Sequence, residues 1–271
     1  MKISLRIIIG LAIFLSALYF FWLSPGYEVP ILTYHYFGNN GKIDGKDYPL
    51  LFVSPDNFEK QMRYLKEKGY RVVSLETLVD GIKEINKFPH NTVVITVDDG
   101  HKSFFTYAYP VLKKYGFPAT VFLVSDIIGA RQDYLDWDEI RQMFTDNISF
   151  GGHTRSHVYL PHIKNKDVLW KEIAGCKEVI EKALGKRIDY FSYPVGGFTK
   201  EARTLVEKAG YKGACSTNRS LSSTNVDVYT LRRVSVRNVN PYFSISNLFP
   251  PISFRAKLSG YYNSFREKKR K

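Results

Sequence analysis

The sequence has only two cysteines, Cys176 and Cys215, among its 271 residues. Two thiols are too few to define a disulfide framework, and the sequence leaves open whether these two pair. There is no internal repeat at the spacing of solenoid proteins and no low-complexity tract, which excludes repeat arrays. No GxGxxG or GxxxxGKS/T motif follows a predicted strand, which counts against a nucleotide-binding fold.

Charged residues are absent from residues 7–26, IIIGLAIFLSALYFFWLSPG, which follow Lys2 and Arg6. About twenty apolar residues span a bilayer, and the aromatic cluster in this run suits a membrane interface. A cleaved signal peptide is the alternative, but the run lacks a small-x-small cleavage site. We therefore expect residues 1–26 to be a single uncleaved transmembrane helix. The two basic residues would keep the N-terminus in the cytoplasm, so that the rest of the chain lies outside the cell.

Acidic residues are in the minority, because 39 Lys and Arg against 26 Asp and Glu give a formal net charge of +13. Such an excess can indicate a nucleic-acid partner. A chain with an export signal is instead expected to meet anionic envelope polymers or lipid head groups, so we expect no nucleic-acid partner. Part of the excess lies in a basic, aromatic C-terminal tail, residues 241–271, which could lie on a membrane surface or remain solvated.

Between these two ends, residues 27–240 show apolar strands that alternate with helical segments. Helices of this length between continuous apolar strands are typical of parallel βαβ units, and about seven such units favour closure into an α/β barrel. The predicted strands are 29–37, 71–75, 92–97, 119–124, 148–152, 190–194, 211–216 and 231–236. The predicted helices are 54–70, 77–85, 103–116, 137–144, 167–186 and 199–210.

Polar residues stand at the C-terminal ends of several predicted strands, where the chemistry of parallel barrels collects. His35 ends the first strand, Asp98 and Asp99 end TVVITV, and His153 and His157 follow ISFGG in the run GGHTRSH. Two adjacent buried carboxylates repel each other and lose hydration, so a nearby cation is expected. Two imidazoles and one carboxylate suit a divalent ion such as Zn²⁺ and leave a position for water. Asp99 can then bind the ion while Asp98 remains free as a base.

The motifs TVDDG, HTRSH and FSYPVGG resemble the three signature motifs of the polysaccharide deacetylase family, also called the NodB homology domain or carbohydrate esterase family 4. The resemblance covers residues 29–237 and includes ILTYHYF, YPVLKKYGFPATVFL and WDEIRQM. It implies a distorted (β/α)7 barrel, with Asp98 as the general base and with Asp99, His153 and His157 as metal ligands. The implied metal is Zn²⁺, with Co²⁺ or Ni²⁺ as alternatives.

The third motif supplies the predicted substrate-binding residues, Tyr193, Pro194 and Val195. The resemblance implies that the backbone N–H of Val195 faces the oxyanion, although a valine replaces the aromatic residue often found there. Tyr193, Phe198 and Trp137 are candidates to stack on sugar rings, although for Trp137, at a helix start, packing is the favoured role.

Two residues common in the family are missing from their usual places. Many members carry an arginine before the third motif that orients the base. Ser192 stands in that region here, so the resemblance leaves the orientation of Asp98 open. The general-acid histidine near the C-terminus is also absent, because no histidine follows His162. His35 is our candidate acid, since the similar poly-N-acetylglucosamine deacetylase branch resembles this YH arrangement, and His101 is the reserve candidate.

The resemblance and the expected location together imply a metal-dependent hydrolase that removes N-acetyl groups from an extracellular N-acetylglucosamine polymer and releases acetate. Poly-β-1,6-N-acetylglucosamine is favoured because the resemblance is to the branch without the C-terminal histidine. Peptidoglycan comes next and chitin oligomers third. The alternative, favoured by the two missing residues, is a catalytically inactive, membrane-tethered carbohydrate-binding protein on the same fold.

Overall fold

The computed structural model describes residues 29–43, 45–83, 88–89, 91–217, 227–238 and 258. The expected transmembrane helix, residues 1–26, lies outside these ranges, and so does the predicted C-terminal tail apart from Leu258. Within the described ranges, no helix combines the length and the apolar character needed to cross a membrane.

In the described part of the chain, nine strands form one sheet in which every pairing is parallel. The order is β12-β11-β10-β9-β8-β7-β1-β13, and β6 pairs with the first residues of β7 off this path. This arrangement confirms the predicted α/β class with parallel strands. The strands are β1 (Ile31–Tyr34), β6 (Arg71–Val73), β7 (Thr92–Val97), β8 (Ala119–Leu123), β9 (Ile148–Gly152), β10 (Tyr190–Ser192), β11 (Gly213–Ser216), β12 (Leu231–Arg232) and β13 (Val234–Ser235).

A single residue joins the two ends of this strand order. β12 pairs with β11, β13 pairs with β1, and Arg233 alone separates β12 from β13 in the chain. The sheet therefore closes into a barrel, and the eight strands on the path fill seven positions because β12 and β13 share one. Closure is weak between β9 and β10, which share one residue pair, Gly152 with Phe191. The barrel is distorted, as the family resemblance implied.

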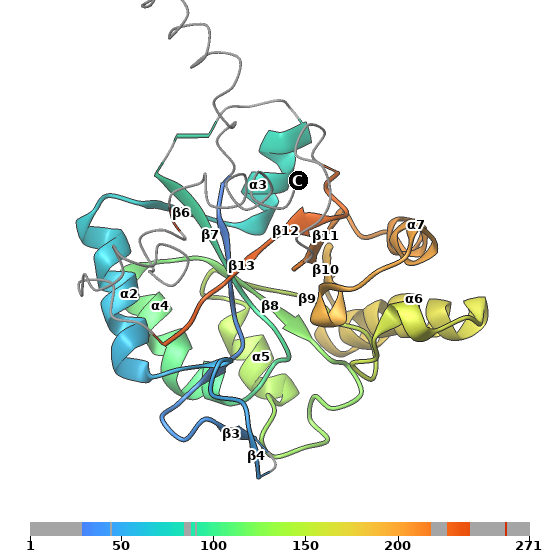
Figure 1. Ribbon diagram of the computed structural model, residues 1–271, viewed down its shortest axis with the longest axis horizontal. Helices are drawn as coiled ribbons and strands as arrows, with labels where there is room; N and C mark the ends of the chain where they lie inside the picture. The colour runs from blue at the N-terminus through green and yellow to red at the C-terminus, as the bar shows by residue number, and fades with distance from the viewer. Residues whose placement is uncertain are drawn as a thin grey trace, which may run out of the picture.

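Helices lie around the outside of the strands (Figure 1). They are α2 (Pro55–Glu67), α3 (Leu75–Lys83), α4 (Tyr109–Tyr115), α5 (Trp137–Met143), α6 (Lys166–Leu184) and α7 (Lys200–Lys208), with a π-helical turn at Phe104–Ala108 and 3-10 turns at Leu160–His162 and Pro194–Gly196. Cys176 on α6 and Cys215 on β11 are both buried, and both are free thiols.

The helix predicted over residues 103–116 is not uniform. Pro110 has no N–H to donate to the carbonyl of Thr106, so a regular α-helical hydrogen bond cannot form there. The chain widens into the π-helical turn instead, in which the N–H of Tyr109 donates to the carbonyl of Phe104. A regular α-helix, α4, then continues from this turn.

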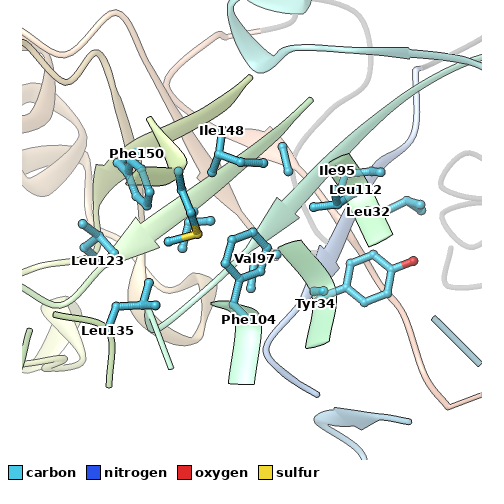
Figure 2. Packing of buried hydrophobic residues seen from close by; sticks show 14 of the residues in the cluster. Leu32, Tyr34, Ile95, Val97, Phe104, Leu112, Leu123, Leu135, Ile148 and Phe150 are labelled. Atoms are coloured by element: carbon cyan, nitrogen blue, oxygen red, sulfur yellow. The ribbon is translucent and has the colours of Figure 1, made fainter. Parts of the chain in front are cut away.

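The core lies inside the ring of strands and between the strands and the helices. Every residue of β7, TVVITV, is buried. Figure 2 shows Ile95 and Val97 of this strand in one buried cluster with Phe104 and Leu112 from the helical segment that follows it. Because packed apolar side chains hold β7 along its whole length, the two aspartates that follow it stand on a rigid support.

Two predicted strands are interrupted, at His35 and at Arg233. β1 ends at Tyr34, and the chain then forms β2 (Tyr36–Phe37), which pairs with β5 (Phe52–Val53) rather than with the barrel. Between β2 and β5 lies an antiparallel hairpin of β3 (Lys42–Ile43) and β4 (Lys46–Asp47). The sequence pattern missed both breaks because an apolar run does not reveal where a strand changes its pairing partner.

Candidate active site

The three predicted metal ligands lie together at the ends of β7 and β9. The Nε2 atoms of His153 and His157 lie 3.4 Å and 3.3 Å from Oδ1 of Asp99. Two ligand atoms bound to one tetrahedral Zn²⁺ at about 2.0–2.1 Å are themselves about 3.3–3.4 Å apart, so these separations fit. Oδ1 of Asp99 is buried and has no hydrogen-bond partner among the described residues. The donor set and the orphaned oxygen both fit a divalent metal ion.

One hydrogen bond orients the imidazole of His153, and another holds the backbone of His157. Nδ1 of His153 lies 2.7 Å from the carbonyl oxygen of Ser192, so Nδ1 carries the proton and Nε2 keeps its lone pair for the ion. The backbone N–H of His157 donates to Oγ1 of Thr154 at 2.9 Å. His153 is buried, whereas the side chain of His157 is 41% exposed. The metal position is therefore open to solvent on the His157 side.

The backbone around these ligands adopts unfavourable conformations. Of the five described non-glycine residues with positive φ, four lie here: Asp99 at 75°, Thr154 at 65°, His157 at 59° and Val195 at 58°. A non-glycine residue in this left-handed region costs about 1–2 kcal/mol. Such strain persists only where the surrounding structure imposes it, and it concentrates at functional sites.

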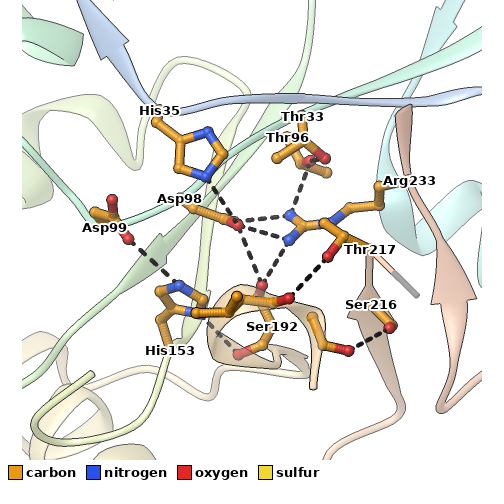
Figure 3. A network of polar contacts seen from close by, with 12 residues as sticks. Thr33, His35, Thr96, Asp98, Asp99, His153, Ser192, Ser216, Thr217 and Arg233 are labelled. Atoms are coloured by element: carbon orange, nitrogen blue, oxygen red, sulfur yellow. Dashed lines mark hydrogen bonds and ion pairs between the residues drawn. The ribbon is translucent and has the colours of Figure 1, made fainter. Parts of the chain in front are cut away.

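The predicted base, Asp98, is held by an arginine from the point where the barrel closes. Arg233 donates from Nη1 to Oδ1 of Asp98 at 2.7 Å and from Nη2 to Oδ2 at 2.6 Å (Figure 3). The same guanidinium donates to Oγ of Ser192 at 2.8 Å and to Oγ1 of Thr96 at 3.2 Å. Asp98 is 3% exposed and Arg233 is 6% exposed. The carboxylate of Asp98 is therefore fixed by a buried, two-bond ion pair.

Arg233 supplies the orienting arginine that the third motif lacks. Ser192, in the region where many members carry the arginine, has a small side chain whose hydroxyl accepts a hydrogen bond from the guanidinium. The sequence motifs did not reveal this contact because Arg233 and Asp98 are 135 residues apart in the chain. One signal could have found it: an arginine in the apolar run LRRVSV needs an anionic partner if it is buried.

Each of the two adjacent carboxylates has its own compensating groups. Burial raises the pKa of Asp98, but the guanidinium of Arg233 and the nearby His153 more than offset burial, and the net pKa is lowered. Burial also raises the pKa of Asp99, but the adjacent imidazoles of His153 and His157 outweigh burial and hold that pKa well below its usual value. Both aspartates are therefore ionised near neutral pH.

His35 lies beside Asp98 at the break between β1 and β2. Its Nε2 is 4.0 Å from Oδ2 of Asp98, and its side chain lines the cavity described below. Burial lowers the pKa of His35 and outweighs the charges of Asp99 and Asp98, which act in the opposite direction, so the net pKa is lowered. The reserve candidate His101 is placed differently: its Nδ1 lies 2.8 Å from Oγ of Ser103, and it is not among the described residues that line the cavity.

The third motif contributes to the site through Val195. This residue is 75% exposed and lines the cavity, and its carbonyl accepts a hydrogen bond from Oγ1 of Thr217 at 3.0 Å. Tyr193 and Pro194 are buried, and neither is among the residues that line the cavity. The ring of Tyr193 stacks on Phe198, and its hydroxyl donates to a backbone carbonyl at 3.1 Å. Tyr193 therefore supports the loop from behind and does not present a surface to a sugar.

A cavity of about 400 Å³ joins the predicted base Asp98, His35 and the three predicted metal ligands. Its wall includes residues outside the three signature motifs, among them Tyr36, Tyr134, Lys46 of the β3–β4 hairpin, and Tyr48. Tyr48 is 41% exposed and so offers an aromatic surface at the cavity. Trp137 packs against the hydrophobic core, the role favoured for it from its place at a helix start.

The sequence is similar to those of known polysaccharide deacetylases. The family model for polysaccharide deacetylase matches residues 85–214. YxkH of Bacillus subtilis, whose name assigns it to the polysaccharide deacetylases, is 30% identical over 209 residues, which are 77% of this chain and 71% of YxkH. The chain belongs to the polysaccharide deacetylase family.

A second relative and a solved structure are also similar to this chain. The poly-β-1,6-N-acetyl-D-glucosamine N-deacetylase of Staphylococcus aureus is 26% identical over 196 residues, which are 68% of this chain and 67% of that protein. The Streptococcus pyogenes deacetylase PplD, in complex with acetate, has a similar structure with a TM-score of 0.72 and 26% identity, over 85% of this chain and 100% of PplD. As a polysaccharide deacetylase with an intact metal-binding triad, this protein is a hydrolase of carbon–nitrogen bonds other than peptide bonds.

Proposed function

We propose that this polysaccharide deacetylase removes N-acetyl groups from an N-acetylglucosamine polymer outside the cell. Poly-β-1,6-N-acetylglucosamine is the favoured substrate, and peptidoglycan is the next candidate. The observation that carries the proposal is that the metal triad, the Asp98–Arg233 pair and His35 converge at one cavity. Amide hydrolysis needs an activated water, a stabilised oxyanion and a protonated leaving nitrogen, and this set of groups can meet all three needs.

Asp99, His153 and His157 would hold a divalent ion, for which we propose Zn²⁺, with Co²⁺ or Ni²⁺ as alternatives. When bound, such an ion lowers the pKa of a water molecule to about 7 and polarises a carbonyl group. Three ligand atoms from the protein are the number found in catalytic zinc sites, which keep a position open.

The side chains around the metal position carry the proton transfers. Asp98, ionised and fixed by Arg233, accepts a proton from the attacking water. The backbone N–H of Val195 faces the charge that develops on the acetyl oxygen, and one such donor contributes about 3 kcal/mol. His35 protonates the departing nitrogen, because an amide anion is expelled poorly. The products are acetate and a glucosamine unit of the polymer.

The substrate class and the location have separate support. The Staphylococcus aureus relative is named for poly-β-1,6-N-acetyl-D-glucosamine. The uncharged apolar run at residues 7–26 supports an anchor that leaves the catalytic domain outside the membrane. The basic tail, residues 241–271, adds charge that an anionic membrane surface attracts. The exposed ring of Tyr48 at the cavity suits packing against a sugar face.

Acetate release from defined oligomers tests the proposal. The protein is incubated with β-1,6 and β-1,4 oligomers of N-acetylglucosamine, with a chelator, and with Zn²⁺ restored after chelation. We expect release from the β-1,6 oligomers that chelation abolishes and Zn²⁺ restores. Release from the β-1,4 oligomers alone would move the assignment to peptidoglycan or chitin. Sugar binding without any release would favour the inactive carbohydrate-binding protein.

A further inference from the structure

The two carboxylate oxygens of Asp99 have different surroundings. Oδ1 is the atom that lies 3.4 Å and 3.3 Å from the imidazoles of His153 and His157. Oδ2 accepts a hydrogen bond from the hydroxyl of Tyr36 at 2.5 Å. One oxygen is therefore engaged by a phenol while the other is left, buried and without a donor among the described residues, at the metal position.

We propose that Tyr36 is a positioning residue of the metal site, which restricts Asp99 to binding the ion through one oxygen and holds that oxygen toward the two imidazoles. This inference rests on the proposed function, because it assumes that the triad binds a divalent ion. A carboxylate that can turn freely has to be ordered when the ion arrives, whereas one held by a partner is already in place. The hydroxyl of Tyr36 therefore raises the affinity of the site.

Tyr36 can hold the carboxylate because its own ring is held by packing. It belongs to β2 and pairs with Phe52 of β5, whose ring centroid is 5.3 Å away. The ring of His101 meets it edge to face at 5.1 Å, and Nδ1 of His101 lies 2.8 Å from Oγ of Ser103. Tyr36 is buried by these contacts. The position of its hydroxyl is thus set by the strand pair β2–β5 and not by Asp99.

The backbone of Asp99 is fixed as well, so the side-chain torsions are the freedom that remains. Asp99 has a φ of 75°, and the next residue, Gly100, has a φ of 68°. A Cβ atom at Gly100 would lie 2.9 Å from side-chain atoms of both Ile128 and Leu123, which shows how closely this turn is packed. With the main chain held, the hydrogen bond from Tyr36 decides which way the carboxylate turns.

The substitution Tyr36→Phe tests the proposal, because it removes one oxygen and keeps the ring against Phe52. Tyr48→Phe is the matched control, since it removes a hydroxyl from an exposed tyrosine of the same cavity wall. Zn²⁺ affinity is measured on metal-stripped protein by competition with a chromophoric chelator, without substrate. We expect Y36F to bind Zn²⁺ about 10–100-fold more weakly than the wild type, the usual effect of losing such a partner. Y48F should bind Zn²⁺ as the wild type does.

The visible absorption spectrum of the Co²⁺-loaded protein gives a second readout that a general loss of stability would not produce. Four-coordinate Co²⁺ absorbs more strongly than five-coordinate Co²⁺. We expect the absorption to weaken in Y36F, because a carboxylate released from the phenol can bind through both oxygens. At saturating metal, the KM for the polymer should stay near that of the wild type.

Unchanged Zn²⁺ affinity together with an unchanged Co²⁺ spectrum in Y36F would overturn the proposal. If the wild type itself binds neither ion, the proposed function fails instead, so the two failures can be told apart. Should Y36F not fold, Phe52→Leu loosens the packing of the tyrosine ring and leaves both oxygens in place. That variant should also bind Zn²⁺ more weakly than the wild type, and undiminished affinity there would count against the role of Tyr36.

Discussion

Substitution of Arg233 tests whether the geometry of Asp98 depends on its buried partner. Arg233→Lys keeps the positive charge but loses the planar fork that bonds both carboxylate oxygens. Arg233→Met removes the charge and both hydrogen bonds while it keeps a long apolar side chain. Arg237→Lys is the matched control, because Arg237 is exposed and lies just beyond β13. We expect a loss of activity in both Arg233 variants, larger in R233M, and none in the control.

The magnitude follows from the contacts of the pair. The two hydrogen bonds, at 2.7 Å and 2.6 Å, join two charged groups. Hydrogen bonds to charged groups contribute about 1.5–3 kcal/mol each, so the loss of both costs about 3–6 kcal/mol. Removing one partner of a buried ion pair typically costs about 3–5 kcal/mol, which agrees. Because Asp98 and Arg233 are 3% and 6% exposed, solvent screening reduces this figure little.

Stability and pH dependence should change together in R233M. We expect its free energy of unfolding to fall by about 3–5 kcal/mol at neutral pH. Without the positive charge of the guanidinium, which lowers the pKa of Asp98, burial should raise that pKa in the variant. The wild type has a lowered pKa for Asp98 and loses this stabilisation as the pH falls, so the difference between the two proteins shrinks in acid. Denaturant unfolding at several pH values measures this difference.

Steady-state kinetics give the decisive assay. Since Arg233 acts on the base and not on the ion or the polymer, kcat should fall about 10²-fold or more in R233K, while KM and bound metal stay near wild-type values. Asp98 must be ionised to accept a proton, so the acid limb of the kcat profile should move to higher pH. Wild-type kcat and an unmoved acid limb in both variants would refute the reasoning. Loss of bound metal in step with kcat would point to general disruption instead.

Asp98→Asn should lower kcat about 10²–10⁴-fold while the metal stays bound, as expected for loss of a general base; loss of the metal would exchange the roles of Asp98 and Asp99. His35→Ala should slow release from an N-acetyl sugar by a similar factor but slow hydrolysis of an aryl acetate ester far less, because an aryl oxide leaves without a proton. Undiminished amide hydrolysis would remove His35 as the acid. Protein extracted from membranes should begin at or near Met1, and a start near Tyr27 would mean that the apolar segment is cleaved.

The barrel could be predicted from the sequence because strands buried on both faces read as continuous apolar runs. β7 is the clearest case, since all of its residues are buried. The changes of strand partner could not be predicted. Residues 29–37 and 231–236 each read as one strand, yet the first divides at His35 and the second at Arg233. These breaks depend on which strand is the neighbour at each point, and that is a property of the closed barrel.

The candidate site divides in the same way. The metal triad could be predicted because its members stand in short motifs beside strand ends. Tyr36 and Arg233 could not, because each reaches its aspartate across a long stretch of chain, 63 residues for Tyr36 and 135 for Arg233. Tyr193 was predicted to contact substrate because it lies in a family motif. Its ring turns into the core and packs against Phe198, so membership of a motif did not determine the direction of the side chain.

The position of Arg233 links closure of the barrel to the orientation of the Asp98 carboxylate. Arg233 is the residue at which the chain passes from pairing with β11 to pairing with β1, and from that position its guanidinium holds Asp98. The three metal ligands follow β7 and β9 and do not depend on that last step. A chain in which β13 is detached from β1 would therefore keep its metal ligands and lose the orientation of its base. We therefore expect metal binding and turnover to be separable in this fold, with turnover alone depending on the strand that closes the ring.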